Sequence, residues 1–224
     1  MTTTIPTENT AVIVVDMQRA FFDNDDSLGR AGIDVTPLRH AIPGTVALVD
    51  AARAAGVPVI FTRYVYMPGM VDFGVTKGAK ASDRIAANSL GYGTDEIELI
   101  PELGARPDEV VIDKSRPSAF YGTRLEPVLT GMGIRNLIVC GVTTNICVET
   151  TVRDAGQRDY ATYVVRDAVA EFTPERNHFA LFGMGWSFGE VVELADVETS
   201  WGGTPSFAGT PQPRVETPLP TVAV

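Results

Sequence analysis

The sequence contains few of the residues that build disulfide frameworks or histidine-rich metal sites. Its 224 residues include two cysteines and two histidines, so neither a disulfide scaffold nor a His-rich metal centre is expected. Cationic residues are also scarce, because Lys and Arg number 18 against 28 Asp and Glu, which gives a net charge of −10. Proteins that bind the phosphate backbone carry the opposite charge. We therefore expect no nucleic-acid partner.

Long apolar runs and targeting signals are missing as well. The apolar runs have the length of β-strands, far short of the ~20 residues that cross a bilayer. Residues 1–10 contain neither a basic segment nor an apolar segment of the signal-peptide type. Together with the scarcity of cysteine, these features lead us to expect a cytoplasmic protein with no membrane partner.

What the sequence does contain is an alternation of short β-branched runs with helical patterns. Apolar residues make up 45% and charged residues 21% of the chain, as in ordinary globular proteins. Buried strands that alternate with helices predict a single-domain, three-layer α/β/α fold with a mostly parallel sheet. The predicted strands cover residues 11–15, 57–62, 110–113, 136–141, 161–166 and 190–194, and the predicted helices cover residues 45–55, 123–132, 146–156 and 174–184.

Two regions depart from this alternation. Residues 66–108 form a long excursion, which is the usual place for substrate-selecting loops. Residues 201–224 hold five of the fifteen prolines and have the composition of a flexible arm. We predict one folded domain over residues 1–200, followed by this arm, which we expect at an interface between subunits.

Three residues with complementary chemistry follow predicted strands. Asp16 follows the first strand, Lys114 the third, and Cys147 lies six residues beyond Gly141, at the start of a predicted helix. Because ligands of parallel sheets bind at the carboxyl ends of the strands, an acid, a base and a thiol at this edge indicate a nucleophilic site.

Each of the three side chains has a definable role. A helix N-terminus and a nearby ammonium group favour the thiolate of Cys147. Asp16 can accept the thiol proton and return it to a leaving amine. Lys114 can stabilise the negative charge of both the Cys147 thiolate and the Asp16 carboxylate. A lone cysteine is more often a small buried hydrophobe, which is our interpretation of Cys140, in the middle of a predicted strand.

Other patterns carry no chemistry. Residues 185–189 match G-x-S-x-G, but this motif belongs on a strand-to-helix turn with a histidine later in the chain. Here it lies between a predicted helix and a predicted strand, and the last histidine, His178, precedes it. No dinucleotide or phosphate loop motif is present, so we expect no cofactor.

The segments that carry the three residues resemble the isochorismatase-like cysteine hydrolases. They are residues 11–23, 110–123 and 141–154, within a similarity over about residues 10–197. The resemblance implies a six-stranded sheet, a catalytic triad of Asp16, Lys114 and Cys147, and a homodimer or homotetramer. It also implies a cis peptide bond between Val142 and Thr143, and an oxyanion hole formed by the backbone amides of Thr143 and Cys147.

The resemblance also implies an activity. Such a protein cleaves a C–N bond of a small amide, ureide or carbamoyl compound through a thioester-like intermediate. Nicotinamidases in the family hold a metal ion through an aspartate and two nearby histidines after the second strand. Residues 63–70 contain no histidine, so we expect a metal-independent enzyme that looks similar to the carbamoyl- and ureidoacrylate-type amidohydrolases. A lactam-opening hydrolase of the streptothricin type, an ether-cleaving isochorismatase and an inactive small-molecule-binding member stay open as alternatives.

Residues near the strand ends and in the excursion are candidates for substrate binding. Arginine guanidinium groups bind carboxylates in a bidentate manner, which makes Arg63, Arg84 and Arg116 candidates for an anionic substrate. Surface ion pairing is an equally good interpretation of Arg84 and Arg116. The residues that we predict to line the substrate pocket are Phe22, Arg63, Tyr64, Asn88, Tyr92 and Trp186.

Overall fold

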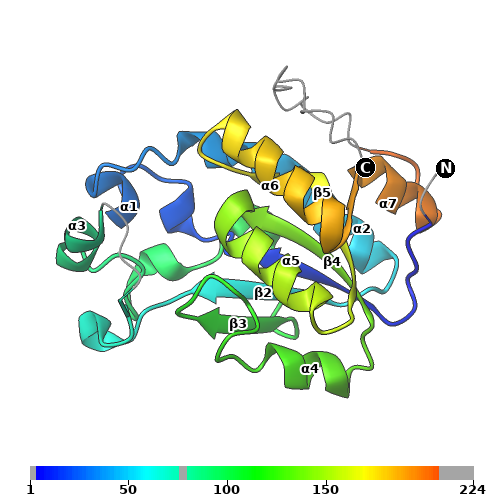
Figure 1. Cartoon of the computed structure of the whole chain (residues 1–224), viewed down its shortest axis with the longest axis horizontal. Helices are drawn as coiled ribbons and strands as arrows, with labels where there is room; N and C mark the ends of the chain where they lie inside the picture. Colours follow the sequence, from blue (N-terminus) through cyan, green and yellow to red (C-terminus); the bar gives the residue numbers. More distant parts are fainter. Residues whose placement is uncertain (1–3, 76–79, 207–224) are drawn as a thin grey trace, which may run out of the picture.

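A six-stranded parallel sheet forms the centre of the molecule (Figure 1). The computed structural model describes residues 4–75 and 80–206. The strand order is β3-β2-β1-β4-β5-β6, and every neighbouring pair is parallel. The strands are β1 (Thr10–Val15), β2 (Val59–Tyr64), β3 (Val110–Lys114), β4 (Asn136–Val142), β5 (Ala161–Ala170) and β6 (Glu190–Val192).

Helices cover both faces of this sheet, which confirms the predicted three-layer α/β/α fold. One apolar core lies between the sheet and α4, α5 and α6, and the other lies between the sheet and α2 and α7. The helices are α1 (Ser27–Arg30), α2 (Ala41–Ala54), α3 (Ala81–Ala86), α4 (Leu125–Gly131), α5 (Glu149–Gly156), α6 (Pro174–Ser187) and α7 (Leu194–Ser200). In the described part of the chain, no helix has the length and apolarity needed to span a bilayer.

The sequence of β1 does not alternate between apolar and polar residues, because the strand lies at the centre of the sheet. All six residues of β1 are buried, because helices cover both faces and β2 and β4 pair with both edges. The chain leaves β1 toward β2 and β3 on one side, and returns to β4 on the other side. This reversal of strand order produces a crevice at the carboxyl ends of β1 and β4, where ligands of such sheets bind.

Several element boundaries differ from the prediction. The strand predicted over 190–194 ends at Val192, because Glu193 and Asp196 form a capping box that starts α7. The sequence did not predict α7. The strand predicted over 161–166 continues to Ala170. The helix predicted over 174–184 begins at Pro174 as predicted, where Thr173 caps it by accepting a hydrogen bond from the backbone N–H of Arg176.

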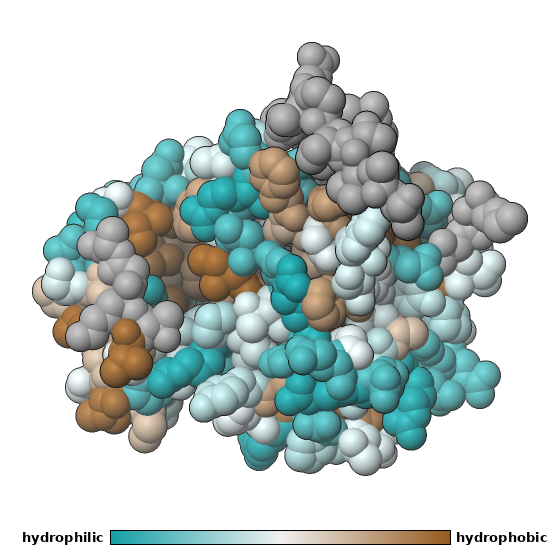
Figure 2. Space-filling model, viewed as in Figure 1, coloured by the Kyte–Doolittle hydropathy of each residue, from teal (hydrophilic) through white to brown (hydrophobic). Residues whose placement is uncertain are grey.

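The excursion over residues 66–108 contains α3 and three short 3-10 turns, Pro68–Met70, Asp95–Ile97 and Pro101–Leu103. In Figure 1, α3 of this excursion lies with α1 beyond the carboxyl ends of the strands, whereas the last residues of the excursion return beside α2 to the start of β3. Figure 2 shows apolar surface in the recess between this region and helices α5 and α6. Residues 207–224 of the predicted C-terminal arm lie outside the described residues.

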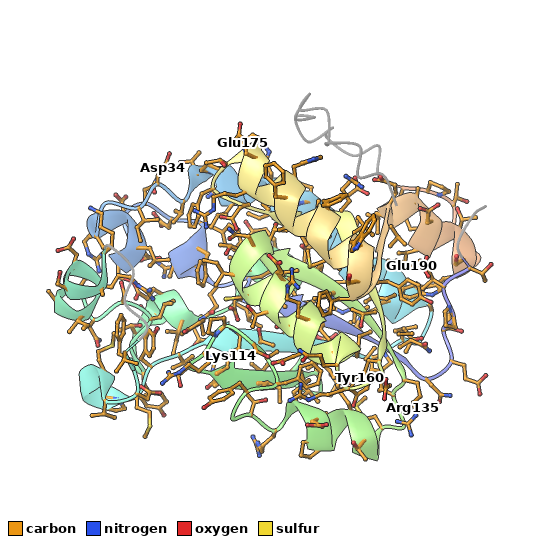
Figure 3. All side chains as sticks on the ribbon, in the orientation of Figure 1. Asp34, Lys114, Arg135, Tyr160, Glu175 and Glu190 are labelled. Carbon is orange, nitrogen blue, oxygen red and sulfur yellow. The ribbon has the colours of Figure 1, made fainter. Side chains whose placement is uncertain are left out.

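The amino ends and the carboxyl ends of the strands lie on opposite sides of the molecule. Lys114 ends β3, whereas Arg135 precedes β4 and Glu190 begins β6. Figure 3 places Lys114 away from Arg135 and Glu190 along the direction of the strands. Lys114, at the carboxyl ends of the strands, is therefore remote from Arg135 and Glu190, at the amino ends.

Gly141 allows β4 to pass unusually close to the end of β1. Its backbone has φ +107, and a Cβ atom there would lie 2.1 Å from the carbonyl oxygen of Val15. Backbone cannot yield as a flexible side chain can, so only glycine fits. This close approach brings the segment after β4 next to Asp16, which directly follows Val15.

We predict that Gly141→Ala lowers the free energy of unfolding by at least about 2 kcal/mol, because overpacking and an unfavourable backbone conformation act together. Urea unfolding measures the effect. Gly133→Ala is the matched control, since Gly133 also has a positive φ but has no atom within 4 Å of the added Cβ. Equal losses in the two variants would contradict the close-approach argument.

Candidate active site

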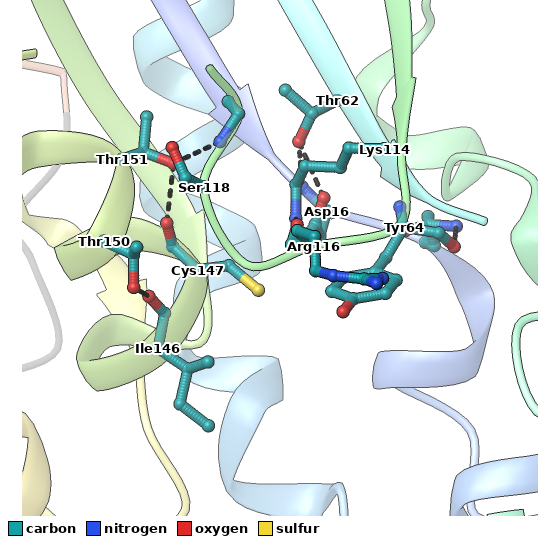
Figure 4. Close-up of polar contacts among 12 residues, drawn as sticks. Asp16, Thr62, Tyr64, Lys114, Arg116, Ser118, Ile146, Cys147, Thr150 and Thr151 are labelled. Atoms are coloured by element: carbon teal, nitrogen blue, oxygen red, sulfur yellow. Dashed lines mark hydrogen bonds and ion pairs between the residues drawn. The ribbon is translucent and has the colours of Figure 1, made fainter. Parts of the chain in front are cut away.

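The side chains of Asp16 and Lys114 form an ion pair that is shielded from solvent. Lys114 Nζ lies 2.7 Å from Asp16 Oδ2, and both side chains are 0% exposed. Thr62, at the end of β2, donates a hydrogen bond of 2.7 Å to the other carboxylate oxygen of Asp16. Lys114 also donates to the backbone carbonyl of Arg116, at 3.1 Å. Thr62 on β2 and Lys114 on β3 therefore hold in place the carboxylate that follows β1 (Figure 4).

The backbone at Asp16 turns sharply as β1 ends. Asp16 has φ +52, a left-handed conformation that aspartate tolerates better than most residues. Its N–H lies 3.2 Å from both the carbonyl and the hydroxyl oxygen of Thr62. This turn points the carboxylate toward the ends of β2 and β3.

Cys147 lies in a π-helical turn, Thr144–Val148, which precedes α5. The peptide bond between Val142 and Thr143 is cis. The carbonyl of Thr143 accepts hydrogen bonds from the N–H groups of Ile146 and Val148. Cys147 therefore lies within one wide turn, not at the first position of a regular helix as the sequence suggested. Its side chain points toward the Asp16–Lys114 pair (Figure 4).

The surroundings of Cys147 shift its thiol pKa in opposite directions. The thiol is buried, and burial raises its pKa to about 12. The Lys114 ammonium lowers the thiol pKa, whereas the Asp16 carboxylate raises it. The ammonium thus favours the thiolate, as expected from the sequence, but it does not outweigh burial. Asp16 is in position to accept the thiol proton.

The pKa of Lys114 reflects the same balance. Burial acts to lower it, but the charge of Asp16 and the hydrogen bond to Asp16 act in the opposite direction, and the pKa is raised from its ordinary value. Lys114 therefore keeps its proton. It lies 4.3 Å from the ring centre of Tyr64, a cation–π distance. The Tyr64 hydroxyl also stays protonated, since burial and then the neighbouring Tyr66 raise its pKa.

The other predicted substrate-binding residues are dispersed. Tyr64 lies beside Lys114, and Phe22 is buried in the apolar core. Tyr92 is 66% exposed and lines a cavity of about 590 Å³ with Lys114 and Arg116. Asn88 is exposed on the excursion. Of this set, Tyr64 is the residue that contacts the charged pair.

Arg63 is a correction to the sequence analysis. Its guanidinium forms a bidentate pair with Asp113, at 2.8 and 3.1 Å, and a further pair with Glu98 at 3.1 Å. Strand residues alternate between faces, so Arg63 points away from the face that carries Thr62 and Tyr64. Its charge is already neutralised by protein carboxylates.

Trp186 is a second correction. It lies near the C-terminus of α6, is 72% exposed and packs against Phe182. Since α6 starts just after the carboxyl end of β5 and runs back along the sheet, its last turn lies at the amino edge. Trp186 is therefore remote from Cys147.

The remaining arginine candidates have different surroundings. Arg116 donates hydrogen bonds to the backbone carbonyls of Asp72 and Ser115, both at 2.6 Å. Arg84 lies over the rings of Phe73 and Tyr66, at 5.4 and 6.0 Å. Among the residues that the structure describes, neither arginine forms the surface ion pair considered in the sequence analysis.

Two polar residues near the site were missed by sequence reasoning. One is Thr62, which lies in the second half of β2. The other is Glu171, whose side chain is fully buried, accepts a hydrogen bond from the N–H of Asn145 at 3.0 Å, and pairs with Arg176 at 3.1 Å. Thr62 lies near the carboxyl end of its strand and Glu171 directly follows β5, and these positions were the available signal.

The described residues were also considered as metal ligands. Within residues 4–75 and 80–206, no three His, Cys, Asp or Glu side chains gather closely enough to hold a metal ion.

Comparison with known proteins identifies the family. Residues 10–196 match the model described as the isochorismatase domain. The chain belongs to the isochorismatase family, which confirms the resemblance deduced from the three motifs. Its three-layer fold is thus the fold of a known family.

Particular relatives extend this comparison. The chain is 32% identical to ureidoacrylate amidohydrolase RutB of Azorhizobium caulinodans, covering 90% of this chain and 94% of that protein. It is 34% identical to the RutB of Pseudomonas syringae pv. syringae, over 88% and 86% of the two chains.

Two solved structures are similar throughout their length. A cysteine hydrolase from Pseudomonas syringae pv. phaseolicola has a TM-score of 0.76 and 29% identity, covering 88% of this chain and 96% of that chain. N-carbamoylsarcosine amidase from Thermoplasma acidophilum has a TM-score of 0.65 and 25% identity, covering 83% and 96%.

We predict that Asp16→Asn speeds the alkylation of Cys147 by iodoacetamide at pH 7 by about tenfold or more, because a neighbouring carboxylate raises a thiol pKa by about one unit or more. In the unsubstituted protein, alkylation is slow at neutral pH and rises steadily as the pH approaches the thiol pKa. Mass spectrometry of the Cys147 peptide gives the rates.

Asp113→Asn is the control for this experiment. Asp113 lies at the same edge of the sheet, but its carboxylate pairs with Arg63. We expect no change in the alkylation of Cys147 in this variant. Alkylation in Asp16→Asn that is no faster than in the unsubstituted protein would contradict the charge balance described for the thiol.

Proposed function

We propose that the protein is a metal-independent cysteine hydrolase that cleaves the C–N bond of a small amide, ureide or carbamoyl compound. Cys147 is the nucleophile, Asp16 transfers protons, and Lys114 holds the negative charge of Asp16 and of the sulfur. The observation that carries this proposal is that the buried Cys147 side chain points toward the ion pair of Asp16 and Lys114 (Figure 4). The similarity to proteins named as ureidoacrylate amidohydrolase and N-carbamoylsarcosine amidase supports a C–N bond as the target.

The first half of the reaction forms a bond to sulfur. Cys147 gives its proton to the Asp16 carboxylate, and the sulfur attacks the substrate carbonyl carbon. The electron pair of the carbonyl moves onto its oxygen, where the N–H groups of Thr143 and Cys147 stabilise the charge. When this intermediate collapses, the C–N bond breaks and the amine leaves with the proton from Asp16.

The second half releases the acyl group. A water molecule attacks the thioester-like carbonyl and gives a proton to Asp16. The C–S bond then breaks, and Asp16 returns the proton to the sulfur, which restores the starting state. Lys114 remains protonated throughout, so the carboxylate has an ammonium partner whenever it is charged. The same proton passes between Cys147, Asp16 and the reacting groups in each half of the cycle.

We predict that Cys147→Ala abolishes turnover, with a loss of at least about 10³-fold, as expected on removal of a nucleophile. Asp16→Asn is expected to lose about 10²- to 10⁴-fold, the usual contribution of a general acid–base group. Ammonia and amine release is measured with chelator present, across a panel of amides, ureides, carbamoyl amino acids and lactams, with isochorismate as the ether.

Cys140→Ala provides the matched control. Cys140 is the other cysteine of the chain, lies in β4 and contacts the carbonyl of Ile13, so its loss should leave kcat near the unsubstituted value. Turnover that persists in Cys147→Ala would contradict the assignment of Cys147 as the nucleophile and would favour ether hydrolysis. No turnover of any panel compound would favour the small-molecule-binding alternative.

A further inference from the structure

A buried carboxylate at the end of β5 has no part in the proposed reaction steps. The side chain of Glu171 is 0% exposed, and it follows Ala170, the last residue of β5. Ala170 pairs with Val142, the last residue of β4. Glu171 therefore lies beside the point where the chain leaves β4 and enters the turn that carries Cys147. Because a buried carboxylate is costly unless it is paired, its contacts indicate what it does.

The first contact of Glu171 is with the backbone of that turn. Its Oε2 accepts a hydrogen bond of 3.0 Å from the N–H of Asn145, two residues before Cys147. The N–H groups at the start of a helical turn have no carbonyl partner within the turn. Glu171 supplies the acceptor for Asn145 from outside, and so anchors the turn to the end of the neighbouring strand.

Arg176 closes a ring of contacts around Asn145. It lies in the first turn of α6 and pairs with Glu171 Oε1 at 3.1 Å. Its guanidinium also donates a hydrogen bond of 3.0 Å to the side-chain oxygen of Asn145, and lies 5.3 Å from the ring centre of Phe172. A planar guanidinium can hold several partners in one fixed geometry. Asn145 is therefore held at its backbone by Glu171 and at its side chain by Arg176, and these two residues are paired with each other.

The Cys147 turn lies between this ring of contacts and the buried ion pair. In the sheet, β4 is placed between β1 and β5, so the turn after β4 has Asp16 on one side and Glu171 on the other. The side chain of Cys147 points toward Asp16 and Lys114 (Figure 4). Without the contacts at Asn145, the turn has more freedom to move away from that pair. A displacement of about 1 Å can lower a rate by about 10²-fold.

From these contacts we infer that Glu171 is a positioning residue for Cys147. Together with Arg176 it holds Asn145, and so keeps the sulfur beside the Asp16–Lys114 pair. Glu171 acts through Asn145 and exchanges no proton with the substrate. Its effect on turnover rests on the proposed hydrolase function, whereas its effect on the placement of the thiol can be measured without turnover.

The test is Glu171→Gln, which keeps the size of the side chain but removes its charge. The N–H groups of Asn145 and Phe172 bond to different oxygens of Glu171, and glutamine offers one oxygen for both. Alkylation of both cysteines by iodoacetamide is followed by mass spectrometry as a function of pH. We expect the Cys147 rate at pH 7 to rise about tenfold or more, because a thiol that leaves its buried position loses the burial that raises its pKa. Cys140 lies in β4, and its rate should not change.

Turnover gives the second readout. Against a compound that the unsubstituted protein hydrolyses, Glu171→Gln should lower kcat about 10- to 100-fold and leave KM within about twofold, because the reacting sulfur moves and the groups that bind substrate do not. Asn145→Ala is the second variant, since it removes the hydrogen bond to Arg176 and leaves the buried ion pair with Glu171 in place. It should change both readouts in the same direction by a smaller factor.

Glu198→Gln is the matched control. Glu198 is also buried and also accepts a hydrogen bond of 3.0 Å from a backbone N–H, that of Ser206. It lies on α7, which packs against the face of the sheet opposite to α5 and α6. This variant should leave the alkylation of Cys147 and kcat unchanged.

Equal acceleration at Cys147 and Cys140 would show a general loosening of the fold and would overturn the positioning role. An unchanged rate at Cys147, or the same change in Glu198→Gln, would overturn it as well. A selective change at Cys147, in a protein that hydrolyses no compound of the panel, would contradict the hydrolase proposal and leave the positioning role in place. Turnover by the unsubstituted protein, with an unchanged kcat in Glu171→Gln, would do the reverse.

Discussion

The solvent-shielded ion pair between Asp16 and Lys114 is the interaction on which the site depends. Taking two charges out of water costs several kcal/mol per ion, and a lone buried charge would destabilise the fold by about 3–5 kcal/mol. The partners come from β1 and β3, and Thr62 on the strand between them binds the same carboxylate. Apolar residues of equal volume would stabilise the sheet at least as well. The value of the pair therefore lies in the charge it places beside the Cys147 thiol, which is protonated at rest.

The sheet topology determines which residues lie next to the Asp16–Lys114 pair. Because β1 and β4 are neighbours with crossovers in opposite directions, their carboxyl ends open into one crevice. Gly141 allows the two backbones to approach closely, and the π-helical turn after it carries Cys147 toward the pair.

Much of this arrangement could be predicted from the sequence. Strands that are buried on both faces appear in the sequence as short runs of apolar, β-branched residues with no polar residues between them. The residues after those runs must share one edge, which brought Asp16, Lys114 and Cys147 together as candidates. Strand alternation would have placed Arg63 on the face opposite Tyr64, and the direction of α6 would have placed Trp186 at the far edge. The pKa of Cys147 and the stacking of Arg84 could not be predicted, since both depend on burial and on contacts between segments distant in sequence.

The central claim is that Cys147 becomes covalently attached to the substrate while Asp16 holds its proton. Acid quenching during turnover of a hydrolysed carbamoyl or ureido compound, followed by mass spectrometry of the cysteine peptides, tests it directly. The account predicts an adduct with the mass of the acyl group on the Cys147 peptide, and none on the Cys140 peptide. Turnover that continues at full rate in Cys147→Ala, with no adduct on the unsubstituted protein, would contradict it.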